Sequence, residues 1–249
     1  MKLKTKKFIY PLQIPTIFVY IHSGMNHGIL RRLWTKMENR DVMKTGTTTV
    51  GLVCKDGVVL AADKRATSGN FIVDKRTQKI FEIFDSMVVT MAGTVSDAQL
   101  LTKLIKAELK LKQIRTGRNP SVKEAANLLS GMIYHNIRKL SLIPGISHFI
   151  LGGCDSDGHW LYDLYADGSL TAVQDFVSSG SGSVIAWGVL ETMYKQGMSV
   201  EEGVKLAVKS VNAALQRDTA SGGGIDVVTV TLTGVNRAVS KEISINLES

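Results

Sequence analysis

TTTVGLVCKDGVVLAAD, residues 47–63, decides the fold of this chain. Two runs rich in β-branched residues flank the sequence KDG, a pattern that predicts two antiparallel strands joined by a tight turn. Two more strands are expected in KIFEIF, residues 79–84, and MVVTMAG, residues 87–93, with a turn between them. The chain from residue 47 onward therefore begins with consecutive hairpins.

Two helices are expected next, each beginning with a capping box, in which a serine is followed three residues later by glutamate or glutamine. Ser96 and Gln99 have this spacing in the first helix, and Ser121 and Glu124 have it in the second. The second helix carries one apolar stripe, formed by Val122, Ala125, Ala126, Leu129, Met132 and Ile133. The stripe predicts that this helix covers a core.

The second half of the chain repeats the order of strands and then helices. Strands are expected over about residues 147–177, followed by a helix that stops at Gly197 and a helix that begins with a capping box of Ser199 and Glu202. The runs DVVTVTLT and AVSKEISI close the chain as strands. This order matches βαβ repeats poorly, and it is typical of an α+β fold in which helices cover two stacked antiparallel sheets.

Composition limits the class of protein. A chain of 249 residues with 44% hydrophobic residues and 4 prolines can bury a sizeable core. The net charge of +8 is concentrated in residues 1–46, which have nine basic and two acidic residues, while the other 203 residues have 21 basic and 20 acidic ones. No nucleic-acid partner is therefore expected. Cys54 and Cys154 lie far apart without a CxxC motif, which argues against a zinc site and fits a reducing compartment.

Residues 1–46 differ from the rest of the chain. MKLKTKK and the apolar run after it resemble the basic and hydrophobic parts of a secretory signal, but the run contains Pro11 and Pro15 and is too short to span a bilayer. An alternative interpretation places the true initiator at a later methionine, Met25, Met37 or Met43. In either case residues 1–46 are expected to lie outside a folded domain of residues 47–249.

The three threonines at the start of the hairpin allow two interpretations. Threonine is a good strand residue, so the run can be plain strand. If KDG forms a three-residue loop with Gly57 left-handed, however, Thr49 lies opposite Asp63. One face at one end of the hairpin then carries four polar side chains, those of Thr47, Thr49, Asp63 and Arg65. Such a cluster suggests a site, and Lys79 can provide a partner for its charges.

Four motifs occur in order: TGTTTVGLVCKDGVVLAADKRATSGNFIVDKRTQKIFEI, VVTMAGTVSDAQLL, SSGSGSVIAWGVLE and RDTASGGGIDVVTV. Over essentially all of residues 46–249 they resemble a proteasome β subunit of the archaeal type. The resemblance implies the four-layer αββα sandwich of the N-terminal nucleophile hydrolases. It also implies a threonine endopeptidase that degrades unfolded polypeptides and needs no metal or organic cofactor.

In that family the chain is made as a precursor and is cut before a threonine that follows glycine, so the resemblance places the nucleophile at Thr47 and the cleavage site between Gly46 and Thr47. A free α-amine, with a pKa of about 8, can accept the hydroxyl proton through water. Removal of residues 1–46 therefore switches the site on. Gly46 is expected to contribute a permissive backbone that takes the strained conformation required by self-cleavage, and Thr48 and Thr49 are expected to be strand residues.

The resemblance assigns further roles. The charge of Lys79 lowers the pKa of the Thr47 hydroxyl and amine, and Asp63 holds that lysine in place. The backbone N–H of Gly93 stabilises the oxyanion, and Arg65 is structural. Three residues order the threonine amine and support the proton relay, namely Ser181, Asp218 and Ser221.

Substrate contacts follow from the same resemblance. Thr67 pairs with the substrate backbone. An uncharged pocket receives the side chain before the scissile bond, lined by Ala66, Thr77, Phe81, Met91 and Val95. Met91 at its floor can adapt to large apolar side chains, so cleavage is expected after Leu, Phe and Tyr rather than after Arg or Lys.

By the same resemblance, the chain is expected in the cytoplasm, in seven-membered β rings stacked with rings of proteasome α subunits, with a regulatory ATPase ring. Three alternatives remain. A β subunit that assembles without processing would be a structural component, although the full set of catalytic residues argues against it. A bacterial-type two-ring relative would be shorter and begin differently, and a small-molecule amidohydrolase would need a polar pocket that the sequence does not reveal.

Overall fold

The computed structural model describes residues 46–141 and 144–243, which all belong to the compact unit Met43–Ser249. The first sheet has the strand order β10-β1-β2-β11-β12, made of β1 (Thr49–Cys54), β2 (Gly57–Asp63), β10 (Phe176–Ser179), β11 (Gly224–Thr231) and β12 (Gly234–Glu242). The second sheet has the order β5-β6-β7-β8-β9, made of β5 (Ile80–Phe84), β6 (Met87–Gly93), β7 (Ser147–Asp155), β8 (Gly158–Leu164) and β9 (Leu170–Val173). Every pairing in both sheets is antiparallel.

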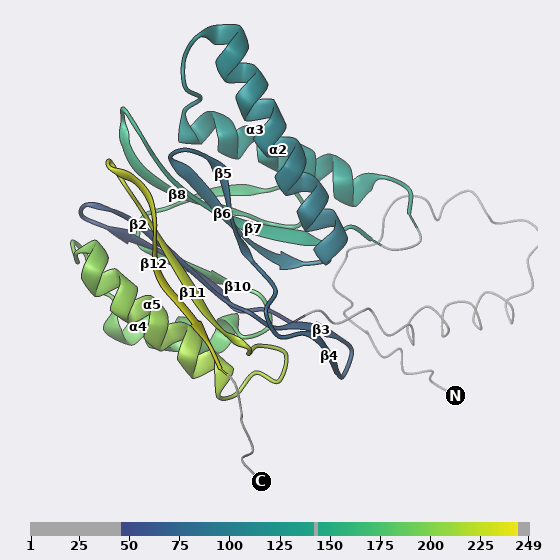
Figure 1. Ribbon diagram of the computed structural model, residues 1–249, viewed down its shortest axis with the longest axis vertical. Coiled ribbons are helices and arrows are strands. Elements are labelled where there is room, and N and C mark those ends of the chain that lie inside the picture. Colours follow the sequence, from purple (N-terminus) through teal and green to yellow (C-terminus); the bar gives the residue numbers. More distant parts are fainter. Residues whose placement is uncertain (1–45, 142–143, 244–249) are drawn as a thin grey trace, which may run out of the picture. The chain divides into compact units, whose positions relative to one another are not determined.

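Helices cover the outer face of each sheet, so that the layers run helix, sheet, sheet, helix (Figure 1). α2 (Val95–Thr116) and α3 (Val122–Arg138) pack on the second sheet, and α4 (Ser183–Met193) and α5 (Val200–Leu215) pack on the first. A further apolar cluster, which includes Leu60, draws its residues from both sheets and fills the space between them. These layers confirm the predicted αββα sandwich.

The hairpin of β1 and β2 is formed, but its register is one residue away from the predicted one. Cys54 pairs with Gly57, which leaves a loop of two residues instead of three. Thr49 therefore lies opposite Ala62, and the prediction that it lies opposite Asp63 was wrong. Gly57 is not left-handed, and a Cβ on it would collide with a carbonyl oxygen of β11. This glycine serves close packing of two strands rather than the turn.

The shifted register changes which polar groups face one another. Because side chains alternate along a strand, the slip puts Thr49 and Asp63 on opposite faces, so the four side chains expected on one face do not share it. Thr48 takes the place opposite Asp63, and its N–H donates to Oδ1 of that carboxylate at 3.0 Å. The Thr49 hydroxyl is instead paired with the hydroxyl of Ser179 on β10, at 2.6 Å.

Two of the three predicted capping boxes are present. At the start of α3, the Glu124 N–H donates to Ser121 Oγ at 3.2 Å, and the Ser121 N–H donates to the Glu124 carboxylate at 2.9 Å. Ser199 and Glu202 form the same reciprocal pair at the start of α5. The local sequence alone was sufficient to locate these two helix starts.

Two helix boundaries differ from the prediction, and a tertiary contact lies at each. α2 begins after Thr94, whose N–H donates to the carbonyl of Ile146, so the expected Ser96 capping box is absent. α4 ends at Met193 instead of continuing to Gly197, because the Tyr194 side chain turns inward and donates its hydroxyl to a carbonyl of β1. A short hairpin of β3 (Ala66–Ser68) and β4 (Phe71–Asp74) was also not predicted.

Residues 1–45 lie outside the described part of the chain, and so do the expectations about a signal or a later initiator. None of the helices among the described residues is long and apolar enough to cross a membrane. The residues expected to carry chemistry are all described.

Candidate active site

The ends of four neighbouring strands meet at one edge of the first sheet. Thr49 at the start of β1 pairs with Ser179 at the end of β10. Asp63, the last residue of β2, pairs with Ile225 near the start of β11. The segments that adjoin these strand ends are distant in sequence. They carry Thr47 before β1, Ser181 after β10, and Asp218 and Ser221 before β11.

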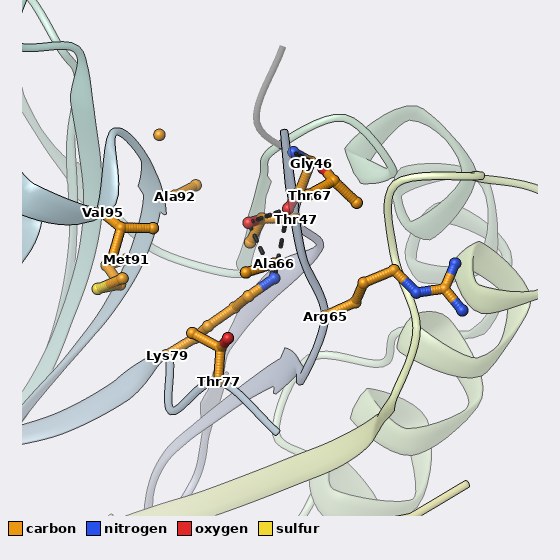
Figure 2. A pocket seen from close by; sticks show the side chains of 11 residues that line it. Gly46, Thr47, Arg65, Ala66, Thr67, Thr77, Lys79, Met91, Ala92 and Val95 are labelled. Atoms are coloured by element: carbon orange, nitrogen blue, oxygen red, sulfur yellow. Dashed lines mark hydrogen bonds between the residues drawn. The ribbon is translucent and has the colours of Figure 1, made fainter. Parts of the chain in front are cut away.

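Thr47 lies two residues before the start of β1, and only 5% of it is exposed. Its hydroxyl donates to the carbonyl oxygen of Gly46 at 2.6 Å and accepts from Lys79 Nζ at 3.0 Å. Its backbone N–H donates to Ser181 Oγ at 3.2 Å. Figure 2 shows the Lys79 side chain reaching toward Thr47 and Gly46. The hydroxyl therefore lies beside the peptide bond that joins Thr47 to the preceding residue.

Lys79 and Asp63 form a buried ion pair below this hydroxyl. Lys79 is 3% exposed, and its Nζ donates to Asp63 Oδ1 at 2.7 Å. The other carboxylate oxygen accepts the backbone N–H groups of Gly222 and Arg65, which fix its orientation. Burial lowers the pKa of Lys79, although the Asp63 carboxylate opposes this shift. A lysine with a lowered pKa is suited to accept and return a proton.

A second hydrogen-bond chain begins at the Thr47 nitrogen. Ser181 Oγ and Ser221 Oγ both donate to Asp218 Oδ2, each at 2.6 Å. Ser221 Oγ is also paired with the Thr48 hydroxyl at 2.7 Å. Since Ser181 contacts the Thr47 N–H, the carboxylate of Asp218 is linked through one hydroxyl to the nitrogen that would become the free amine.

A pocket opens beside Thr47 and Lys79 (Figure 2). Most of the residues expected to bind substrate line it, namely Ala66, Thr67, Thr77, Met91 and Val95, together with Gly93. Phe81 is not among the lining residues. It lies opposite Val89, which faces the helices, and it packs on the apolar cluster between the second sheet and α2 and α3.

Arg65 lines the rim of this pocket, but its guanidinium points away from Thr47 and Lys79 (Figure 2). It donates to the carbonyl of Thr219 at 2.9 Å. The guanidinium also lies so close to Gly222 that a Cβ there would collide with it. Arg65 thus contacts the loop that carries Asp218 and Ser221, in agreement with the structural role expected for it.

Gly46 is expected to take a strained conformation during self-cleavage, and this stays a prediction. It is not among the glycines with positive φ, so its backbone conformation is open to residues other than glycine. What it lacks is space, because a Cβ on Gly46 would overlap the Cβ of Ala220. Its N–H donates to Thr67 Oγ1 at 3.0 Å. The close approach of Ala220 therefore favours glycine at this position.

Sequence reasoning missed several residues that shape this site. Ser179 binds the Thr49 hydroxyl, Gly222 binds the Asp63 carboxylate, and Ala220 packs on Gly46. The run TASGG, residues 219–223, contained the signal for the last two, since a run of small residues indicates that backbones approach closely. Ser179 had no signal beyond its place in a strand.

Comparison with known proteins agrees with this arrangement. A sequence model of the family described as proteasome subunit matches residues 43–230. The proteasome subunit beta of Methanocaldococcus vulcanius is 45% identical over 205 residues, which cover 82% of this chain and 90% of that protein. The proteasome subunit beta of Archaeoglobus profundus is 44% identical over 212 residues, covering 85% of this chain and 97% of that protein. The chain therefore belongs to the proteasome subunit family, as its sequence motifs predicted.

Proposed function

We propose that this chain is the catalytic β subunit of a 20S proteasome, a threonine endopeptidase that degrades unfolded polypeptides and uses Thr47 as its nucleophile. One observation carries the proposal: the Thr47 hydroxyl contacts both the carbonyl of the preceding peptide bond, at 2.6 Å, and the buried amine of Lys79, at 3.0 Å. An alcohol placed between a carbonyl and a base is the arrangement that acyl transfer requires.

The first reaction of this site is cleavage of its own chain. The hydroxyl oxygen of Thr47 attacks the carbonyl carbon of Gly46, and its proton passes to the neutral amine of Lys79. The bond between this carbon and the Thr47 nitrogen then breaks, the nitrogen takes the proton from Lys79, and residues 1–46 remain as an ester on the Thr47 oxygen. Water hydrolyses the ester, which leaves a carboxylate on Gly46 and a free amine and hydroxyl on Thr47.

The mature site then applies the same chemistry to substrate. The free amine of Thr47 accepts the hydroxyl proton through water, and the hydroxyl oxygen attacks the scissile carbonyl. Ser181 and Asp218, joined by a hydrogen bond of 2.6 Å, hold that amine in place. The N–H of Gly93 at the end of β6 is the proposed donor to the oxyanion. The scissile C–N bond then breaks, and the leaving amine of the substrate takes the proton from the Thr47 amine. Water hydrolyses the remaining ester and restores Thr47.

The family also suggests where this reaction takes place. We propose that the chain assembles into seven-membered β rings that stack with rings of proteasome α subunits in the cytoplasm, and that a regulatory ATPase ring delivers unfolded chains. The pocket beside Thr47 has an apolar floor at Met91 and Val95, which supports a preference for large apolar residues before the scissile bond.

The test of the proposal is the N-terminus of the working subunit. In particles assembled from this chain and its α subunit, N-terminal sequencing and intact mass should find Thr47 as the first residue. Thr47→Ala should retain residues 1–46 and hydrolyse no peptide, because no other hydroxyl contacts both the Gly46 carbonyl and Lys79 among the described residues.

Two matched variants complete the test. Thr47→Ser keeps a hydroxyl at the same place and should retain processing. Thr49→Val removes a neighbouring hydroxyl that pairs only with Ser179 among the described residues, and this variant should also be processed. Wild-type particles that keep residues 1–46 would instead identify a structural β subunit. Hydrolysis by Thr47→Ala would mean that the nucleophile lies elsewhere.

A further inference from the structure

Gly46 is held on three sides in the uncut chain. Its N–H donates to the Thr67 hydroxyl at 3.0 Å, and its carbonyl oxygen accepts from the Thr47 hydroxyl at 2.6 Å and from Lys79 Nζ at 3.4 Å. These contacts aim the carbonyl at the nucleophile and the base. A residue at position 46 that moved by a fraction of an ångström would lose this alignment.

Ala220 closes the remaining side. A Cβ built on Gly46 overlaps the Cβ of Ala220 and lies 2.7 Å from its Cα and 2.8 Å from its carbonyl oxygen. Carbon atoms in contact normally lie about 3.5–4.0 Å apart. Any side chain at position 46 would therefore have to displace either the scissile bond or the backbone at Ala220.

The loop that carries Ala220 is tied down on both sides. The Ala220 N–H donates to Asp218 Oδ1, and the Ser221 N–H donates to the Asp218 carbonyl. Arg65 donates to the carbonyl of Thr219. Ser221 and Asp218 also hold Thr48 and Ser181, so a shift of this loop would disturb the groups around the Thr47 nitrogen.

We propose that Ala220 is a specificity-determining residue of self-cleavage: with its loop, it admits only glycine before Thr47. The proposal rests on the proposed function, because it concerns the precursor's own scissile bond. According to this proposal, Ala220 restricts the cleavage of the propeptide but not the cleavage of substrates. Ala220 limits what stands before Thr47 while the peptide bond is intact, and it loses this contact once residues 1–46 leave.

The experiment follows the rate at which residues 1–46 are released when full-length subunits assemble with their α subunit, measured by intact mass. Gly46→Ala should slow the release by roughly tenfold or more, because it overfills a packed site. Gly131→Ala, on α3, is the matched control. A Cβ there meets no atom within 4 Å, so its release should equal that of the wild type.

Ala220→Gly supplies the second half of a double-mutant cycle. The single variant Ala220→Gly should release residues 1–46. If its particles also hydrolyse peptides, the loop that carries Asp218 and Ser221 is still correctly folded. Combined with Gly46→Ala it should recover release by roughly threefold or more over Gly46→Ala alone. Recovery should be incomplete, because the Cα and carbonyl oxygen of residue 220 still lie within 3 Å of the added methyl.

Three results would overturn the assignment to Ala220. One is normal release by Gly46→Ala, and another is a double variant no faster than Gly46→Ala. The third is Ala220→Gly that fails to mature, since the methyl would then be needed for the reaction itself. Each presupposes that the wild type releases residues 1–46; a wild type that does not would instead contradict the proposed function.

Discussion

At the scale of single residues, Lys79 allows a prediction about pH. Burial lowers its pKa below the ordinary lysine value of 10.5, so it loses its proton at a lower pH than a free lysine does. Only the neutral amine can take the proton of the Thr47 hydroxyl. The rate of self-cleavage should therefore rise with pH and level off above the lowered pKa of Lys79, with a midpoint below 10.5.

The measurement is single-turnover release of residues 1–46 from newly assembled particles across a pH series. Lys79→Arg is the control, because arginine stays protonated throughout and should not mature at any pH in the series. A release rate that falls as the pH rises would exclude Lys79 as the base.

Met91 supports a prediction about specificity. A charged side chain entering a pocket lined by Ala66, Thr77, Met91 and Val95 would lose hydration and find no opposite charge among these four residues. Cleavage after Leu, Phe and Tyr should exceed cleavage after Arg and Lys by about tenfold or more, or roughly 1.4 kcal/mol in transition-state binding. Matched fluorogenic peptides ending in Leu, Tyr, Arg and Glu measure this, and equal or faster turnover after Arg would contradict it.

At the scale of elements, the helix starts differ in how they are capped, and this difference can be measured. Ser121 caps α3 through its side chain, so Ser121→Ala should lower the stability of the subunit by about 1 kcal/mol. Ser96 lies in the first turn of α2, and among the described residues its hydroxyl forms a hydrogen bond only with Asp97, so Ser96→Ala should change stability little. Urea unfolding midpoints of the two variants test the contrast, and equal losses would contradict it.

The same elements show what the sequence could predict about the fold. Most of the strands, the order of strands and helices along the chain, and two capping boxes follow from local sequence patterns, whereas the four-layer sandwich was implied by the resemblance to a known family. The errors lie where a contact with a segment distant in sequence determines a turn or a helix boundary. Gly57 is a glycine because β11 passes close to it, Thr94 starts α2 because it binds Ile146, and Tyr194 ends α4 because it binds β1.

The candidate site divides in the same way. Thr47, Asp63 and Lys79 were found by their motifs, and the structure places Lys79 within hydrogen-bond distance of both Thr47 and Asp63. The predicted sharing of one face by Thr47, Thr49, Asp63 and Arg65 was wrong, because a loop shorter by one residue puts Thr49 and Asp63 on opposite faces. The run TASGG indicates that backbones approach closely at residues 219–223, but Gly46 is distant in sequence, so the run could not identify it as the partner of Ala220.

At the scale of the whole molecule, the candidate active site and the exposed apolar side chains involve different residues. Thr47 is buried, whereas several large apolar side chains on β4, α2 and α4 are exposed, among them Phe71 and Val184, each at 79%. In the proposed particle such surfaces are covered by neighbouring subunits. Assembly should therefore depend on the outer surface and be indifferent to the hydroxyl in the site.

Thr47→Ala tests this separation, because it removes one buried hydroxyl and one methyl group and leaves every exposed apolar side chain in place. It should form particles of the same size as the wild type, as measured by size-exclusion chromatography. Isoelectric focusing in urea then compares the dissociated β subunits. The Thr47→Ala subunit should keep all 30 basic and 22 acidic residues and have an isoelectric point near 9.4. A wild-type subunit that has lost residues 1–46 keeps 21 basic and 20 acidic residues and should have a lower isoelectric point. Failure of Thr47→Ala to assemble would show that the hydroxyl supports the fold or an interface, and equal focusing of the two subunits would show that maturation had not occurred.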